Sequence, residues 1–144
     1  MAQNKTATKS RSKTFSDEEK AAMKEAARER RSSKGNGEAD LLAKIAEMQD
    51  ADRAVAERVH QIVTEHAPGL TPKTWYGMPA YTRDGKVVCF FQPSAKFKTR
   101  YSTFGFNDRA KLDDGAMWPV AFAVTELTPD VEERIAALVK RAAS

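Results

Sequence analysis

An Asp-Gly pair at residues 84–85 lies between two apolar runs, residues 74–81 and 87–91, and it constrains the fold more than any other feature of the chain. Both residues of a two-residue hairpin turn need positive φ, which Asp-Gly pairs tolerate, so this arrangement is the strongest short-range signal for a β-hairpin. We therefore predict a hairpin over residues 73–92 that is apolar on both faces. Such a hairpin must be covered on both sides, unless one side is a binding surface.

The turn also sets the expected pairing of the two strands. A two-residue loop places Thr82 opposite Val87 and Ala80 opposite Cys89. Because side chains alternate along a strand, one face then carries Tyr76, Met78, Ala80 and Thr82. The other face carries Trp75, Pro79, Tyr81, Val88 and Phe90.

Two residues distinguish the first predicted strand. Pro79 has no N–H to donate to a ladder, so we expect its strand to be an edge or to be bulged there. Gly77 has no side chain, so another backbone or a ligand can approach closely. A kinked strand with these aromatic neighbours can form the wall of a pocket. The alternative is that the aromatic residues fill the core of a small domain.

A helical pattern precedes the domain. Ser16 followed by Glu19 forms a capping box, so we predict a helix rich in Ala, Glu and Arg from there to about Ser33. Its apolar residues are four alanines and one methionine, a thin stripe, so we expect it to pack loosely on the domain or to stand free of it. The Lys-Gly-Asn-Gly sequence at residues 34–37 ends this helix as a flexible joint.

The rest of the chain predicts alternating short elements. They are an amphipathic helix around residues 41–48, a second helix capped by Asp50 or Asp52, the hairpin, strands over residues 96–101 and 121–125, and a last helix opened by Thr128 and Pro129. A polar turn or short helix is expected over residues 107–114. Helices followed by strands with short turns are typical of an α+β fold. We predict an antiparallel β-meander sheet packed by helices on one face, with a basic helical arm at the N-terminus.

The net charge of +4 is unevenly distributed. Residues 1–34 hold ten Lys and Arg against five Asp and Glu, a charge of +5, so the remaining chain carries −1. We therefore divide the 144 residues into a disordered basic tail (1–14), an N-terminal helix and joint (15–37) and one α+β domain (38–144). Since the domain itself has no evident basic face, we expect no nucleic-acid binding beyond non-specific contacts of the arm.

Nothing in the sequence predicts a membrane-spanning or secreted protein. No window approaches about 18 consecutive apolar residues, and no apolar stretch follows the basic N-terminus. The single cysteine, Cys89, cannot form an internal disulfide and lies among Val and Phe, so we expect a small core residue rather than a nucleophile. We expect a cytoplasmic protein without a membrane partner.

One stretch of the chain resembles a known family. The run is Trp75-Tyr76-Gly77-Met78-Pro79-Ala80-Tyr81, followed by Asp84-Gly85-Lys86-Val87-Val88-Cys89-Phe90-Phe91 and by a strand with lysines and aromatics. It resembles the YdhG-like family of bacterial domains of unknown function, over roughly residues 38–142. The resemblance implies an α+β fold with an antiparallel sheet. Some members are described as frataxin-like iron chaperones, which implies weak iron binding as an alternative function.

Iron binding would have to rely on carboxylates. His60 and His66 lie six residues apart on a predicted helix and do not point to one site, so we expect surface residues there. The candidate carboxylates are Glu38, Asp40, Glu47, Asp50, Asp52 and Glu57, with Asp113 and Asp114 as a smaller set. Interleaved Lys and Arg residues favour a solvated surface of mixed charge, and we commit to no metal site.

The sequence contains no Gly-x-Ser-x-Gly, no phosphate-binding Gly-rich loop and no paired His/Glu zinc motif. We therefore predict a non-enzymatic binding domain, with no cofactor assigned. The predicted contact residues are Trp75, Tyr76, Met78, Pro79 and Tyr81 of the hairpin, with Lys98 or Arg100 at the rim. The occupant is an unidentified small ligand or the apolar patch of a protein partner, and a homodimer is a further alternative.

Overall fold

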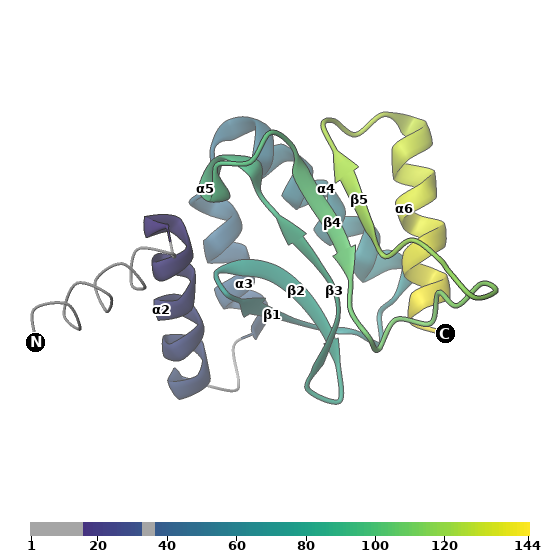
Figure 1. Cartoon of the computed structure of the whole chain (residues 1–144), viewed down its shortest axis with the longest axis horizontal. Coiled ribbons are helices and arrows are strands. Elements are labelled where there is room, and N and C mark those ends of the chain that lie inside the picture. Colours follow the sequence, from purple (N-terminus) through teal and green to yellow (C-terminus); the bar gives the residue numbers. More distant parts are fainter. Residues whose placement is uncertain (1–15, 33–36) are drawn as a thin grey trace, which may run out of the picture.

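The chain builds one antiparallel sheet with helices packed against it (Figure 1). A computed structural model describes residues 16–32 and 37–144. Its elements are α2 (Asp17–Ser32), α3 (Gly37–Ala46), α4 (Asp50–His66), β1 (Thr71–Trp75), β2 (Met78–Arg83), β3 (Lys86–Gln92), α5 (Ser94–Phe97), β4 (Ser102–Phe106), β5 (Ala121–Val124) and α6 (Pro129–Ala142). The strands pair in the order β1-β2-β3-β4-β5, so the predicted α+β meander is confirmed.

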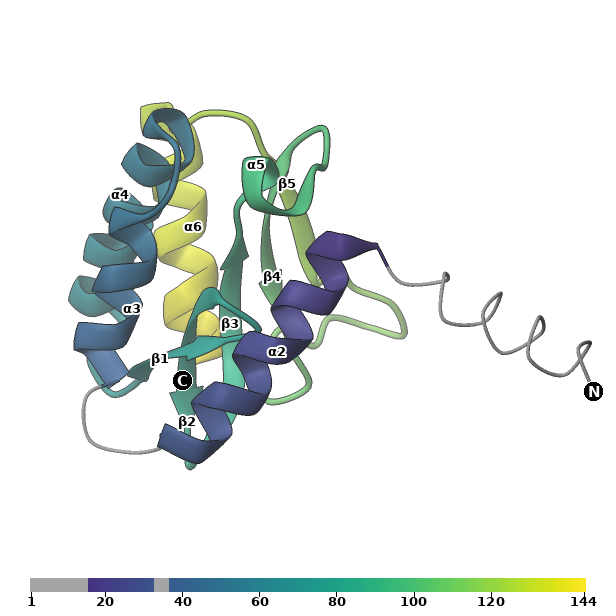
Figure 2. The ribbon, with the colours of Figure 1, turned by 90° about the vertical axis from the view of Figure 1, so that its left-hand side faces the viewer.

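The helices form two separate groups. Helices α3, α4 and α6 cover one face of the sheet, which we call the helix face, whereas α2 lies beside the β1–β2 hairpin (Figure 2). The core between the helix face and these helices includes Leu41, Val63, Tyr81, Phe91 and Val139, each at most 1% exposed. None of the helices among the described residues is long and apolar enough to cross a bilayer.

The first predicted strand is in fact two strands joined by a tight turn. Tyr76 has φ 53° and Gly77 has φ 77°, as Asp84 and Gly85 have 53° and 78°, so both loops have the positive φ values of a type I′ turn. The expectation of one kinked strand was therefore wrong, because Trp75 pairs with Met78 across the first turn.

Pro79 lies inside the sheet without disrupting it. Its strand, β2, has a neighbour on both sides, so of the two expected alternatives the edge position is not found, whereas β2 does carry a bulge, between Tyr81 and Thr82. Trp75 and Met78 flank the two-residue turn and form a hydrogen-bonded pair. Because hydrogen-bonded and non-hydrogen-bonded pairs alternate, the next pair, Thr74 with Pro79, is not hydrogen-bonded. The side of Pro79 that lacks an N–H therefore points away from β1. Pairing with β3 begins only at Ala80, so no ladder donor is lost at Pro79.

A bulge changes the predicted register of β2 and β3. Thr82 pairs with Val87 as expected, but the register shifts between Tyr81 and Thr82, and Ala80 pairs with Phe90 rather than with Cys89. Because side chains alternate along β2, Pro79 and Tyr81 point to one face of the sheet, which is the helix face. Trp75, Met78, Ala80 and Phe90 lie on the opposite side, which we call the outer face.

The segment over residues 96–101, predicted to be a strand, forms α5 and a turn instead. Lys98 has φ 54° and ends α5, and β4 starts only at Ser102. The cause lies on α4: the carboxylate of Asp52 accepts hydrogen bonds from the backbone N of Ala95 (2.9 Å) and from the hydroxyl groups of Ser94 (3.3 Å) and Ser102 (3.2 Å). Asp52 therefore stabilises the start of α5, and α4 itself begins after Gln49 without a side-chain cap.

The two helix caps with clear sequence signals are confirmed. Ser16 and Glu19 exchange the two hydrogen bonds of a capping box, and the Thr128 side chain accepts a bond from the backbone N of Val131. The predicted tail (1–14) lies outside the described residues, as do residues 34–36 of the predicted joint. Gly37, expected in that joint, is the first residue of α3.

Candidate functional site

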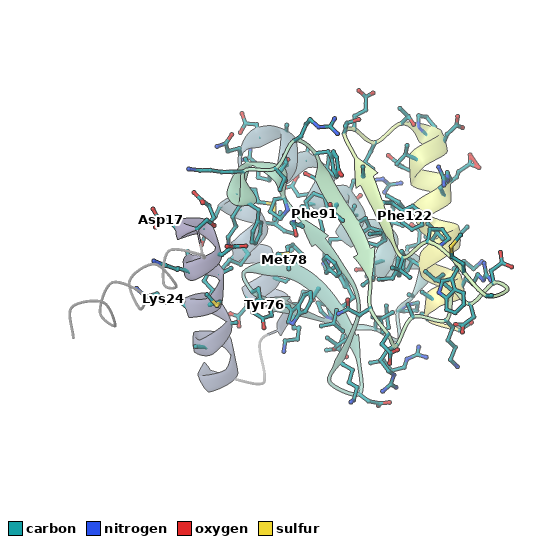
Figure 3. The ribbon with its side chains drawn as sticks, viewed as in Figure 1. Asp17, Lys24, Tyr76, Met78, Phe91 and Phe122 are labelled. Atoms are coloured by element: carbon teal, nitrogen blue, oxygen red, sulfur yellow. The ribbon has the colours of Figure 1, made fainter. Side chains whose placement is uncertain are left out.

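The Tyr76–Gly77 turn stands at the end of the sheet nearest α2, between two hollows of the surface. Figure 3 shows Tyr76 and Met78 at this end, on the side of the sheet nearest α2, with Phe91 and Phe122 farther along the sheet. Tyr76 lines a groove of about 490 Å³ on the outer face, and Gly77 lines a cavity of about 310 Å³ between α2, α3 and α5. The turn therefore contributes to both candidate sites.

The groove extends from Trp75 and Tyr76 towards the Asp84–Gly85 turn. It is lined by Ala26, Lys73, Trp75, Tyr76, Gly85, Lys86, Val87, Asn107, Asp108 and Arg109. These residues come from α2, from β1, from the β2–β3 hairpin and from the loop after β4. Its volume lies within the range of small-molecule sites, about 300–1,000 Å³.

Aromatic rings form one wall of the groove. Trp75 packs edge-on against Tyr76 and tilted against Phe90, with ring centroids 5.2 Å apart in both pairs. Phe90 in turn covers Gly105 of β4, where an added Cβ would overlap the phenyl ring. Trp75 thus packs against Phe90, and its side chain stays partly exposed.

Cations outnumber anions at the groove. Lys73, Lys86 and Arg109 line it together with the single carboxylate of Asp108. Arg109 reaches Asp84 at 3.4 Å, a long and exposed contact that holds the guanidinium weakly. The groove can therefore offer positive charge next to an aromatic wall.

The structure separates the contact residues predicted from the sequence. Trp75 and Tyr76 line the groove, and Met78 lies beside them on the outer face but is only 6% exposed. Pro79 and Tyr81 are fully buried on the helix face, so placing them on one surface with Trp75 was wrong, because the extra turn puts Trp75 on the face of Met78.

The two predicted rim cations lie outside the groove. Lys98 binds Glu18 of α2 at 2.8 Å, and Arg100 stacks over Tyr101 at 5.1 Å from the ring centroid. Neither side chain comes from a strand face, because residues 96–101 are not a strand. The cations that do line the groove are Lys73 within β1, Lys86 at the start of β3 and Arg109 in the loop after β4. Only the correct strand boundaries could have singled out the two lysines.

Tyr81 belongs to a polar chain within the helix face. Its hydroxyl lies 3.0 Å from Nδ1 of His60, whose Nε2 lies 3.0 Å from the Glu38 carboxylate. The rings of His60 and Tyr81 stack at 5.8 Å. Burial raises the pKa of the Tyr81 hydroxyl, which therefore stays protonated. His60 was expected on the surface, but it joins α4 to β2 and α3.

The candidate iron ligands are dispersed or already engaged. Asp52 stabilises α5, Glu38 contacts His60, and Asp50 binds Arg53 at 2.9 Å. In residues 16–32 and 37–144, no group of three or more His, Cys, Asp or Glu side chains is placed to hold a metal ion. Cys89 is completely buried, and burial raises the pKa of its thiol, as suits the core residue predicted.

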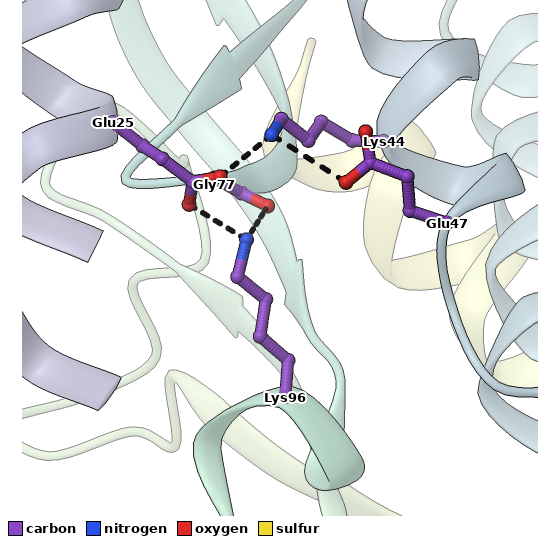
Figure 4. Close-up of polar contacts among 5 residues, drawn as sticks. All are labelled: Glu25, Lys44, Glu47, Gly77 and Lys96. Atoms are coloured by element: carbon purple, nitrogen blue, oxygen red, sulfur yellow. Dashed lines mark hydrogen bonds and ion pairs between the residues drawn. The ribbon is translucent and has the colours of Figure 1, made fainter. Parts of the chain in front are cut away.

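An ion cluster that the sequence did not predict lies on the other side of the turn (Figure 4). One oxygen of Glu25 on α2 lies 2.6 Å from Nζ of Lys44 on α3, and the other lies 2.7 Å from Nζ of Lys96 on α5. Lys96 also donates to the Gly77 carbonyl at 3.1 Å, and Glu47 lies 3.6 Å from Lys44. Burial favours the neutral form of Glu25, but the hydrogen bonds from Lys44 and Lys96 outweigh it and lower its pKa.

The cluster opens into the second hollow. The cavity of about 310 Å³ is lined by Glu25, Lys44, Glu47, Met48, Gln49, Asp52, Gly77, Pro93, Ala95 and Lys96. Gly77 is required here for two reasons: its φ is positive, and an added Cβ would overlap the Glu25 carboxylate and the Lys96 ammonium. No single segment of the sequence contains this site, because four separate elements contribute its charges and its backbone.

We compared the chain with protein-family models, curated proteins and solved structures, and none of the three comparisons gives a match.

Proposed function

We propose that the protein is a non-enzymatic binding domain whose outer-face groove takes up a small ligand with a planar apolar body and an anionic group. The observation that carries this proposal is the aromatic wall of Trp75 and Tyr76 beside the cations Lys73 and Lys86 in one groove of about 490 Å³. The YdhG-like resemblance stays a prediction beside it.

The apolar part of the ligand follows from the geometry of the wall. Trp75 is fixed between Tyr76 and Phe90, so a ligand ring can stack on it without ordering a mobile side chain. Val87 adds an aliphatic surface to the same groove. A flat body therefore gains more contact area here than a branched one.

The anionic group follows from the charges. Three cations and one carboxylate line the groove, so it attracts an anion and repels a cation of the same shape. Since Lys73 stands on β1 and Lys86 on β3, with β2 between them, their joint effect depends on the folded sheet rather than on a sequence motif.

The proposal can be tested with 8-anilinonaphthalene-1-sulfonate, a flat aromatic anion. We expect saturable binding to the full chain with one site, weakened by salt. Trp75→Leu should lose most of this binding, and Lys73→Gln together with Lys86→Gln should weaken it severalfold. Arg100→Gln is the matched control, because Arg100 is an exposed cation beside an aromatic ring outside the groove.

Three outcomes would contradict the groove proposal. Unchanged binding by a folded Trp75→Leu variant would place the probe elsewhere. Sedimentation that shows a dimer whose interface includes Trp75 would favour the homodimer alternative. A saturable site in an iron titration that persists in Trp75→Leu would favour the iron-binding alternative.

A further inference from the structure

We propose that Lys44 and Lys96 form a second binding site, for a small oxyanion, which the Glu25 carboxylate of α2 occupies in the free chain. This site lies on the other side of the Tyr76–Gly77 turn from the groove and does not depend on the function proposed there. A carboxylate or phosphate group of a ligand would take the place of Glu25.

The first argument is the geometry of the two lysines. Lys44 comes from α3 and Lys96 from α5, and both ammonium groups reach the same carboxylate, at 2.6 and 2.7 Å (Figure 4). Their side chains are only 19% and 30% exposed. Two half-buried ammonium groups directed at one carboxylate are the arrangement that binds an oxyanion. Lysines act as point charges, so the site accepts carboxylate or phosphate alike.

The second argument is the free space beside the carboxylate. The cavity of about 310 Å³ starts at the cluster and continues along Met48, Pro93 and Ala95. If Glu25 served only to hold α2 against the domain, we would expect close packing around it, as in a protein interior. Here the lysines border a space in which the rest of a ligand can lie. Two further carboxylates border this space. Asp52 is engaged by α5, and Glu47 lies 3.6 Å from Lys44 with a side chain that is 67% exposed, so it can turn towards solvent when an anion binds.

The third argument is how little apolar contact holds α2. In the described side chains of α2, the buried apolar residues are Ala22 and Ala26, each of which buries one methyl group. Glu18 pairs with Lys98, whose side chain is 72% exposed, whereas the Glu25 side chain is only 15% exposed. Among the described side chains of α2, Glu25 therefore makes the least exposed ion pairs with the domain, and an anion that competes for the two lysines weakens this attachment.

Competition within the chain has a measurable consequence. When Glu25 occupies the lysines, only the fraction of molecules with α2 displaced can bind, so the apparent Kd rises by the inverse of that fraction. Removal of the Glu25 carboxylate should therefore strengthen anion binding, by at least about tenfold if the occupied form dominates.

The experiment uses the full chain with Glu25→Ala, and Glu25→Gln as a second variant that preserves side-chain shape. Sodium phosphate and sodium acetate are titrated at constant ionic strength against sodium chloride. Binding is measured by the thermal unfolding midpoint and by the amide resonance of Gly77, with Gly115 as the matched reference because its φ is similar, at 70°, and nothing lies within 4 Å of a Cβ added there. Glu18→Ala is the helix control, since it loosens α2 without emptying the lysine pair.

We expect at least one Glu25 variant to bind phosphate or acetate at least about tenfold more tightly than the wild type, with a shift at Gly77 and none at Gly115. The anion with the lower Kd identifies the group that the site prefers. Adding Lys96→Met to the Glu25 variant should abolish the gain. The proposal is overturned if both Glu25 variants bind no more tightly than the wild type, if Glu18→Ala shows the same gain, or if Lys96→Met leaves it intact.

Discussion

The carboxylate of Asp52 on α4 accepts a hydrogen bond of 2.9 Å from the backbone N of Ala95, 43 residues later in the chain. Through this bond and those with Ser94 and Ser102, one side chain joins α4 to α5 and to the start of β4. Pro93, which precedes α5, and Lys96, which lies on α5, line the cavity at the ion cluster. The position of Asp52 thus determines where Lys96 stands.

Asp52→Ala should destabilise the protein by about 2–3 kcal/mol, because it leaves a backbone N–H and two hydroxyl groups without their charged acceptor. Asp50→Ala removes a neighbouring carboxylate that is 94% exposed and should change stability little. Urea unfolding of the two variants measures the difference. Equal destabilisation by both would show that Asp52 is not the connection between these elements.

Tyr81→Phe should cost about 1–2 kcal/mol of unfolding free energy, since it removes the hydroxyl that meets Nδ1 of His60 within the core. Tyr101→Phe, on an exposed tyrosine, is the matched control and should be nearly neutral. Denaturant unfolding with both variants tests the expectation. A neutral Tyr81→Phe would mean that the His60 contact adds no net stability.

The two type I′ turns provide a matched pair of glycine substitutions. Gly85→Ala should cost about 1–2 kcal/mol from its positive φ alone, because nothing lies within contact of the added Cβ. Gly77→Ala carries the same cost and also displaces Glu25 and Lys96, so we expect a larger loss and release of α2. Thermal unfolding and amide exchange in α2 measure both effects. Identical results for the two variants would show that Glu25 does not pack on Gly77.

The contact of α2 should depend on pH through Glu25. The folded pKa of Glu25 lies below its ordinary value of 4.5, so its contribution is complete above about pH 4.5 and is lost as the pH falls through the lowered pKa. The Gly77 amide resonance should therefore show an acid transition that persists in Glu18→Ala and disappears in Glu25→Gln. Persistence in Glu25→Gln would assign the transition to another group.

Much of the architecture was predictable because its signals are local. The Asp84–Gly85 turn, the capping box at Ser16 and the Thr128–Pro129 helix start each depend on residues within a few positions of one another. The meander order was predicted from short turns, which the structure has between β1, β2 and β3, whereas residues 93–101 and 107–120 form longer connections. Such features need no knowledge of distant contacts.

The errors arose where a distant or less common preference decided the structure. Tyr is an unusual residue at positive φ, so the Tyr76–Gly77 turn was not recognised, and the missed turn placed Trp75 on the same face as Pro79 and Tyr81 instead of the opposite one. The strand predicted over residues 96–101 was replaced by α5 because Asp52, remote in sequence, stabilises it. In the candidate site, Trp75 and Tyr76 were found from their aromatic character, whereas Lys73, Lys86 and Glu25 became evident only from the folded arrangement.

The close contact of Phe90 with Gly105 gives β4 an influence on a groove that it does not line. Any side chain at position 105 would lift the Phe90 ring, and with it the Trp75 indole that leans on that ring. Relatives of this domain could therefore alter the ligand size that they accept by a single change in a strand remote from the ligand, with every groove residue kept the same.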